Sequence, residues 1–182
     1  MEATKLTVLK DALREIIDAG GYIPDQESFN LLYQVVRGAA AEVCAVNERG
    51  ELLLHYREFT EWPGEWGKVK SWYIPGGLIR TKDRTMEEEC HGNLKKDGVL
   101  NQIQFIEVCH SYPWKRGEHP FGWLFVSNLC VCRLVGELCV ADGMEDKFKF
   151  VDEIVPSTVP HHTKFQEEFF KWRNRNAHLF NR

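Results

Sequence analysis

A glycine pair followed by an acid-rich segment is the feature of this sequence whose residue types and spacing could do chemistry. Gly76 and Gly77 follow the short apolar run 72–74 through Pro75. Because glycine has no side chain, two in a row let the main chain approach a ligand closely. The segment 85–96 has helical spacing and begins with acidic residues. Carboxylates gathered by such a helix suit Mg²⁺ bound to a diphosphate, since Mg²⁺ takes oxygen ligands and keeps several waters.

Three polar residues spaced four apart, Glu89, Asn93 and Asp97, share one stripe of that helix. Two carboxylates and an amide oxygen could hold one Mg²⁺, and Asp83 or Glu107 could add a ligand from outside the helix. The candidate metal ligands are therefore Glu89, Asn93, Asp97 and Asp83, and Asp97 is also a catalytic candidate. The alternative is structural, because acidic residues early and lysines late in a helix form a solvated face that complements its dipole.

Basic residues close to the glycine pair could contact a phosphate. Arg57 ends the segment 51–57, Arg80 follows the glycines, and Lys96 lies near the end of the acidic helix. A lysine ammonium meets a phosphate as a point charge but does not readily generate hydroxide, so Lys96 favours binding over hydrolysis. Together with the two glycines and Trp66, whose ring could stack on a base or sugar, these are the candidate substrate-binding residues. Surface exposure and loop packing are the alternatives.

Histidines supply the candidate general bases, because a near-neutral pKa suits the activation of water. His119 lies in a loop that begins at Pro113, and we take it as the catalytic candidate with Asp97. The others are His110, His161 and His162. Each of them could instead be a surface or capping residue.

The elements that must position these residues alternate between helices and strands. Periodicity predicts helices over 4–18, 24–36, 85–96 and 163–173, and strands over 39–47, 51–57, 71–74, 103–110, 123–134 and 148–151. The glycine pair is expected in a loop between a strand and the acidic helix. This is an α+β pattern, with an N-terminal helical arm over 1–36 and one domain over 37–182.

Composition places the chain among globular proteins. It has 182 residues, 43% of them apolar, and 27 acidic against 23 basic side chains give a net charge of −4. This balance argues against a nucleic-acid partner. No apolar run approaches the roughly 18 residues that a membrane-spanning helix needs. Six cysteines without paired spacing indicate reduced thiols and a cytoplasmic location.

The segment from Gly77 to Val99 resembles the Nudix box, G-x5-E-x7-R-E-U-x-E-E-x-G-U, where U is a bulky aliphatic residue. Without gaps, Gly77 and Gly98 take the two glycine positions and Asp83 the first glutamate, but histidine, glycine and lysine stand where the arginine and later glutamates belong. One extra loop residue and one fewer residue before Gly98 fit the helix better, since Met86, Cys90 and Leu94 then form its apolar stripe. On either alignment most metal-binding glutamates are missing.

The resemblance extends over about residues 24–170 and is nearest to the GDP-mannose mannosyl hydrolases. It is carried by "NERGELLLHYR", "WYIPGG", "GWLFVSNLCVCRL" and "KFKFVDEIVPSTVPHH". It implies a mixed β-sheet sandwiched between helices in an α/β/α arrangement. It also implies a nucleoside diphosphate-linked small molecule as ligand and bound Mg²⁺. The N-terminal helical arm could serve packing or homodimer formation.

Two functions follow from this resemblance. The first is Mg²⁺-dependent hydrolysis of a nucleoside diphosphate sugar of the GDP-mannose type, which the missing glutamates weaken. The second is a catalytically inactive Nudix-fold module that binds a nucleotide or a protein. The sequence leaves open whether the protein is an enzyme.

Overall fold

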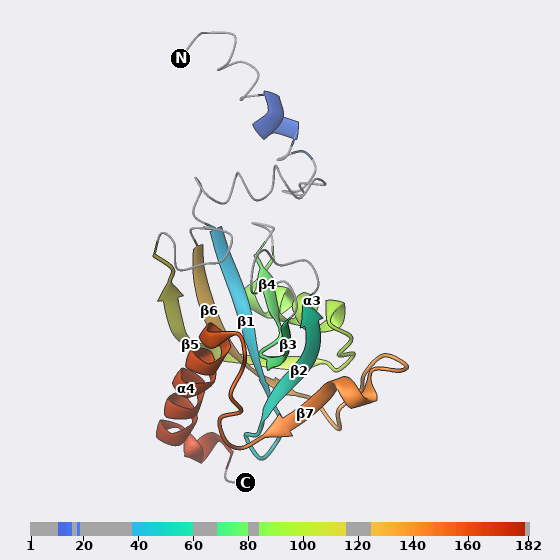
Figure 1. Ribbon diagram of the computed structural model, residues 1–182, viewed down its shortest axis with the longest axis vertical. Coiled ribbons are helices and arrows are strands. Elements are labelled where there is room, and N and C mark those ends of the chain that lie inside the picture. The colour runs from blue at the N-terminus through green and yellow to red at the C-terminus, as the bar shows by residue number, and fades with distance from the viewer. Residues whose placement is uncertain are drawn as a thin grey trace.

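The fold is a mixed sheet covered by helices (Figure 1), seen in a computed structural model that describes residues 11–15, 18, 38–59, 69–79, 84–115 and 125–180. Residues 11–15 and 18 are helical, as expected for part of the 4–18 helix. The rest of the predicted arm, with the 24–36 helix, lies outside the described residues. So do Trp66, Arg80, Asp83 and His119.

Seven strands form one sheet in the order β3-β2-β1-β6-β5, while β4 pairs with β1 and β7 with β2. Their bounds are β1 Gly38–Val46, β2 Leu52–Phe59, β3 Val69–Tyr73, β4 Gly76–Leu78, β5 Ile103–Pro113, β6 Phe125–Leu134 and β7 Phe148–Val151. The helices are α3 Met86–Lys96 and α4 Pro160–Arg175, with short 3₁₀ turns at Glu145–Lys147 and Ala177–Leu179. The pair β1 and β6 is parallel and the other pairs of these seven strands are antiparallel, so the sheet is mixed as predicted.

The strands β1 and β2 pair with each other next to the turn that joins them, at Val46 and Leu52. Beyond this point each of them pairs with a different strand. Farther from the turn β1 pairs with β4, and β2 pairs with β3. The short connection from β3 to β4 therefore crosses from one strand to the other. It is held there because the Val43 backbone N–H donates to the Pro75 carbonyl at 2.6 Å. The glycine pair follows directly and forms β4, which corrects the expectation of a loop.

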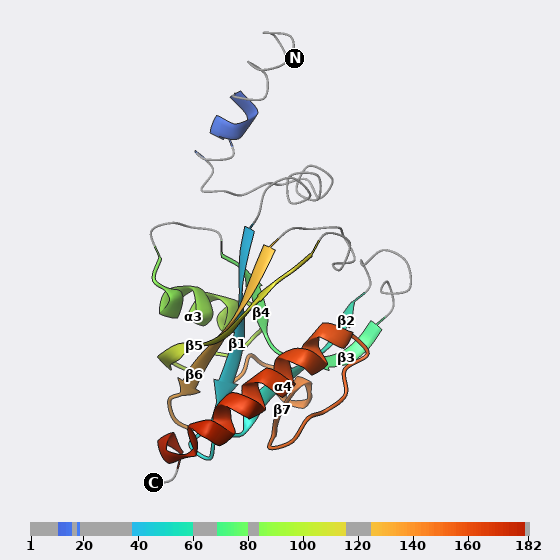
Figure 2. The same ribbon diagram turned by 90° about the vertical axis from the view of Figure 1, so that its left-hand side faces the viewer.

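The two helices cover opposite faces of the sheet (Figure 2), which confirms the α/β/α prediction. Alternate residues of β1 divide between two buried clusters. On the α3 side the cluster includes Ala41, Val43, Ala45, Cys90 and Leu94. On the α4 side it includes Ala40, Cys44, Val46, Phe165 and Phe169. All six cysteines are free thiols, and four of them are buried in this interior.

The helix α3 begins at a capping box. The Thr85 hydroxyl accepts the Glu88 backbone N–H, and the Glu88 carboxylate accepts the Thr85 backbone N–H at 2.7 Å. These bonds satisfy two backbone donors that a helix start leaves unpaired. The helix ends at Asp97, after which Gly98 adopts a φ of +98°, a left-handed conformation that suits glycine.

The helix α4 begins three residues before the predicted start. Pro160 occupies its first turn, where the fixed φ of proline suits a helix and its missing N–H costs no hydrogen bond. Periodicity alone missed this turn because the apolar stripe begins later. Within the described residues, no helix combines the length and apolarity needed to cross a bilayer.

Replacing Thr85 with alanine should lower the free energy of unfolding by about 1 kcal/mol, because the cap hydroxyl is lost from the start of α3. Urea unfolding followed by circular dichroism would measure this change. Lys164→Ala, at an exposed position of α4, is the matched control. Equal stability of the two variants would contradict the role of the capping box.

Candidate functional site

The glycine pair lies between two polar side chains that approach β4 from opposite faces. A Cβ atom on Gly77 would stand 2.6 Å from the Asn93 Oδ1 atom on the α3 side. A Cβ atom on Gly76 would collide with the Glu42 Oε2 atom, since Gly76 pairs with Glu42 across the β1–β4 ladder. The missing side chains therefore make room for the protein's own polar groups.

Asn93 ties α3 to the two strands below it. Its amide nitrogen donates to the Ala41 carbonyl at 3.4 Å and to the Gly77 carbonyl at 3.5 Å. These are long hydrogen bonds, but Asn93 and Ala41 are buried. The helix is thereby docked on the glycine strand.

Asp97, at the end of α3, belongs to a buried polar cluster with Tyr73 and His55. The Tyr73 hydroxyl lies 2.7 Å from His55 Nδ1 and donates to Asp97 Oδ2 at 3.4 Å, and His55 Nδ1 lies 3.7 Å from the same carboxylate oxygen. Phe148 stacks on the His55 ring with 4.4 Å between centroids. Burial and the negative charge of Asp97 raise the pKa of Tyr73, so this hydroxyl keeps its proton and donates it.

Of the candidate phosphate contacts that the structure describes, Arg57 interacts with this cluster, and Lys96 is next to one of its members in the sequence. Arg57, an exposed residue of β2, acts on the same hydroxyl, because its positive charge opposes the rise in the pKa of Tyr73. Lys96 is exposed in the last turn of α3, next in sequence to Asp97. The structure thus brings Arg57 and Asp97 to one tyrosine, whereas the link of Lys96 to the cluster is its place in the sequence.

The candidate metal ligands of α3 form a buried stripe. Glu89, Asn93 and Asp97 are all buried. Glu89 therefore does not belong to a solvent-exposed acidic face of the helix, which was the structural alternative to a metal site. The Asn93 amide is engaged with backbone carbonyls, and the Asp97 carboxylate is engaged with Tyr73. Across the described ranges, no three His, Cys, Asp or Glu side chains meet in a way that could hold a metal ion. The described donors alone therefore do not fit Mg²⁺, and the metal site with Asp83 stays a prediction.

Glu42 is the site residue that the sequence reasoning missed. Its Oε1 atom accepts the Ser127 hydroxyl at 3.0 Å, and Ser127 in turn accepts the Trp114 indole N–H at 3.0 Å. Burial raises the pKa of Glu42 to about 7, the Ser127 hydrogen bond opposes this rise, and the charge of Asp97 adds to it. A single carboxylate inside the apolar strand AAAEVCAV was the signal that could have found it.

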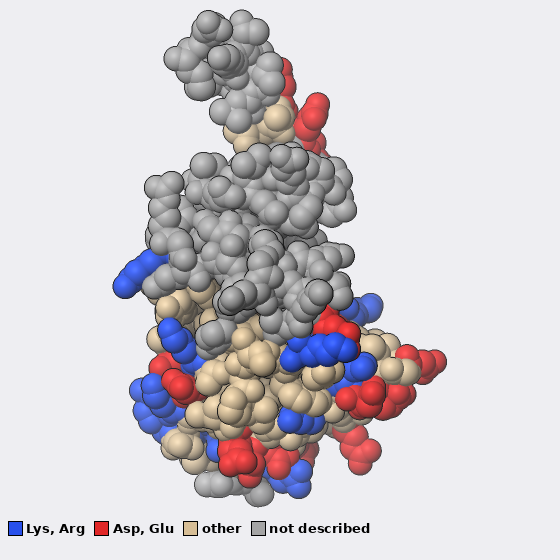
Figure 3. Space-filling view, in the orientation of Figure 1, with Lys and Arg blue, Asp and Glu red and all other residues tan. Residues whose placement is uncertain are grey.

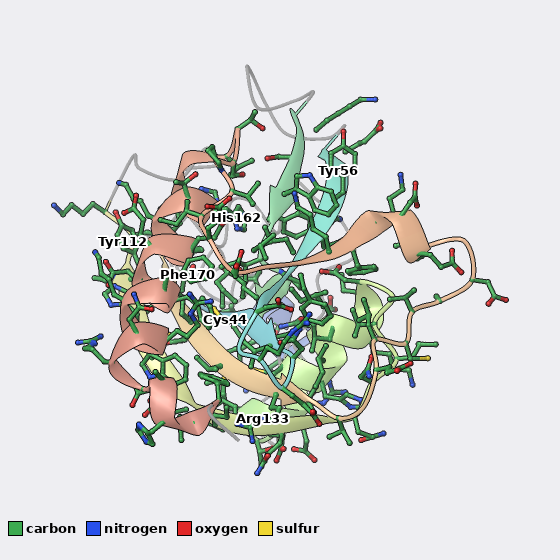
Figure 4. The ribbon with its side chains drawn as sticks, turned by 90° about the horizontal axis from the view of Figure 1, so that it is seen from below. Cys44, Tyr56, Tyr112, Arg133, His162 and Phe170 are labelled. Carbon is green, nitrogen blue, oxygen red and sulfur yellow. The ribbon has the colours of Figure 1, made fainter. Side chains whose placement is uncertain are left out.

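His162, near the start of α4, points into the interior (Figure 4). Its side chain is 5% exposed, and its ring packs edge-on against Tyr73 with 5.4 Å between centroids. Within the described residues its Nδ1 atom has no hydrogen-bond partner. Burial therefore lowers the pKa of His162 to about 3, and the ring is neutral at physiological pH.

The charged side chains that surround the described part of the molecule are mixed in sign. In Figure 3, lysine and arginine lie among aspartate and glutamate around a centre of uncharged residues. Among the described residues, ion pairs join Lys70 to Glu58 and Lys171 to Glu168, each at 2.7 Å. This face presents no broad field of one sign.

Comparisons with known proteins identify the fold. No protein-family model matches the chain, and no curated protein does. Among solved structures, the MutT protein from Methanosarcina mazei Go1 is 15% identical to this chain with a TM-score of 0.53, and the match covers 77% of this chain and 95% of the MutT chain. A UDP-X diphosphatase is 15% identical to this chain with a TM-score of 0.55, and the match covers 96% of this chain and 82% of the diphosphatase chain. A NUDIX hydrolase from Nitrosomonas europaea is 12% identical with a TM-score of 0.55, covering 78% and 90%. The chain has the Nudix fold.

Gly77→Ala should lower the free energy of unfolding by about 2 kcal/mol, because the new methyl group would overlap Asn93. Combining it with Asn93→Ala should relieve the overlap, so the double variant should be more stable than the sum of the two single changes predicts. Denaturant unfolding of all four proteins measures this coupling.

Gly92→Ala is the control for this cycle. A Cβ atom there meets a single described atom, at an ordinary 3.5 Å, and alanine should stabilise the helix by about 0.5–1 kcal/mol. Strictly additive effects of Gly77→Ala and Asn93→Ala would contradict the contact.

The contribution of His162 to stability should fall as the pH decreases below 6.5. The folded pKa of about 3 lies below the ordinary histidine value of 6.5, so the unfolded chain binds the proton more readily. About 2 kcal/mol of this contribution should be lost between pH 6.5 and pH 4.5. Because the raised pKa of Glu42 changes stability in the opposite direction over this range, the contribution of His162 is read as the difference between the wild-type protein and His162→Phe in denaturant unfolding at several pH values. His178→Gln, at an exposed position, should keep the pH dependence of the wild type, and an unchanged slope in His162→Phe would refute the assignment.

Proposed function

We propose that the protein uses its Nudix fold to bind a nucleoside diphosphate derivative of the GDP-mannose type, and that binding rather than Mg²⁺-dependent hydrolysis is its function. The observation that carries the proposal is the position of Asn93 over Gly77. The glycine strand β4 and the helix α3 are docked on each other within a Nudix fold. The side chain at their contact is an amide whose nitrogen donates to two backbone carbonyls and whose oxygen lies against Gly77, so Asn93 turns both of its polar atoms toward the strands rather than toward a metal ion.

Positive charge near the cluster supports diphosphate binding. Arg57 and Lys96 are both exposed, and a guanidinium or ammonium can neutralise phosphate oxygens without a metal ion. Arg80 and Trp66 belong to the same proposal as phosphate and base or sugar contacts. We also propose that the protein is cytoplasmic and that it forms a homodimer.

Hydrolysis is the weaker candidate because the described groups that the sequence singled out for catalysis are not placed to activate water. Asp97, the first catalytic candidate, is buried and accepts a hydrogen bond from Tyr73. The nearby His162 is neutral but buried, with 5% of its surface exposed. His119, with Mg²⁺ at Glu89, Asn93, Asp97 and Asp83, remains the hypothesis for an active enzyme.

The purified full chain should bind GDP-mannose in the presence of EDTA, measured by calorimetry, and should release no product from GDP-mannose or ADP-ribose with Mg²⁺. Arg57→Gln should weaken binding about tenfold, because a charge-assisted hydrogen bond to phosphate is lost. Arg175→Gln, an exposed change at the far end of α4, is the matched control.

Turnover that requires Mg²⁺ and disappears in Asp97→Asn would replace the binding proposal with the hydrolase. Absence of both binding and turnover for every nucleotide tested would leave the protein-interaction module.

A further inference from the structure

Arg57 and Tyr73 are diagonal neighbours on one face of the sheet. In the β2–β3 ladder, His55 pairs with Tyr73. Arg57, two residues farther along β2, pairs with Ser71. Residues two apart on a strand point to the same face, so the side chains of His55, Arg57 and Tyr73 share it. Diagonal neighbours across an antiparallel ladder are about 7–8 Å apart, a distance that long side chains span. The strand register therefore lets the Arg57 side chain reach the Tyr73 hydroxyl.

The Tyr73 hydroxyl is fixed from the interior of the protein. It donates to Asp97 Oδ2 at 3.4 Å, and it lies 2.7 Å from His55 Nδ1. Because a carboxylate only accepts hydrogen bonds, the single hydroxyl proton goes to Asp97, and His55 donates from Nδ1. The side chains of His55 and Asp97 are 7% and 4% exposed. Both partners are packed in place, which leaves the hydroxyl in one orientation.

The oxygen of the same hydroxyl also accepts a hydrogen bond from the surface. The Arg57 guanidinium forms a side-chain hydrogen bond with Tyr73, and the guanidinium is the donor because it has no acceptor. Arg57 is exposed, whereas Tyr73 is buried. A chain of hydrogen bonds thus runs from the buried carboxylate of Asp97 through Tyr73 to a positive charge at the surface.

This chain prepares Arg57 to bind an anion. A guanidinium has five N–H donors in a rigid fork, so one of them can bind Tyr73 while others remain for phosphate oxygens. An exposed arginine without such a bond samples many rotamers and loses that freedom when a ligand binds. Because Tyr73 already restrains Arg57, less side-chain entropy is lost on binding.

Building on the proposed function, we propose that Tyr73 is a positioning residue, which holds the Arg57 guanidinium ready to bind a phosphate group of the nucleoside diphosphate derivative. The hydroxyl acts through Arg57 and does not touch the ligand. Asp97 has the task of orienting the hydroxyl from behind. The buried cluster therefore serves binding, and this service requires no proton transfer.

A double-mutant cycle on binding tests this role. Calorimetry of the full chain with GDP-mannose and EDTA compares the wild type, Tyr73→Phe, Arg57→Gln and the double variant. Tyr73→Phe should weaken binding about fivefold in the wild-type background, because the guanidinium is no longer restrained. With Arg57→Gln already present, the same change should alter the affinity by less than about twofold. A general loss of packing would instead weaken binding equally in both backgrounds.

Tyr56→Phe is the matched control for the lost hydroxyl. Tyr56 precedes Arg57 on β2 and therefore points to the opposite face, where its ring packs on Trp72 with 5.3 Å between centroids. This variant should bind GDP-mannose with wild-type affinity.

Arg57→Lys gives a second test that does not depend on how well Tyr73→Phe folds, because residue 57 is exposed. Lysine keeps the positive charge but lacks the rigid fork that bridges the hydroxyl and a phosphate. Its affinity for GDP-mannose should be about fivefold lower than that of the wild type. Equal affinity would overturn the role of Tyr73, since charge alone would then suffice.

The outcomes separate this inference from the proposed function. An equal loss from Tyr73→Phe in both backgrounds, or no loss in either, would overturn the positioning role and leave nucleotide binding standing. If the wild-type protein does not bind GDP-mannose, the proposed function fails and this inference fails with it.

Discussion

The structure depends on a packing constraint at Gly76 and Gly77. The chain must cross from β2 to β1 at this point, because β3 pairs with one strand and β4 with the other. Glu42 and Asn93 occupy the space on the two sides of β4 where side chains of residues 76 and 77 would lie. Glycine at both positions therefore allows the strand, the docked helix and the polar groups to coexist.

This constraint changes how the glycine pair relates to function. Paired glycines after a strand suggest a backbone that cradles a phosphate, but here they form a paired strand and contact protein side chains. The link to chemistry is indirect. By docking α3 through Asn93, the glycine strand brings the end of that helix, with Asp97, beside Tyr73 and His55 of the neighbouring strands. The cluster is thus positioned by the crossing.

The interior around the crossing contains polar groups that an ordinary core would avoid. His162 has an unpartnered ring nitrogen in the described structure, and Glu42 has a carboxyl group with a raised pKa. Buried polar groups without full pairing reduce stability, so folds that keep them commonly use them. The solved structures of similar shape are 12–15% identical to this chain, which leaves the ligand to be decided by these residues and by experiment.

The local pattern of the sequence determined most of the elements. Alternation and helical periodicity predicted β1, β2, β7 and α3 to within a residue or two at most boundaries, and the apolar stripe of α3 was also predicted. These predictions succeeded because burial of a regular element repeats along the chain with its own period. The burial of Asn93 and Asp97 and the pairing of the glycines were decided by the tertiary structure. Glu42 and His162 became notable only there, because what a polar side chain meets depends on strand register and on residues distant in sequence.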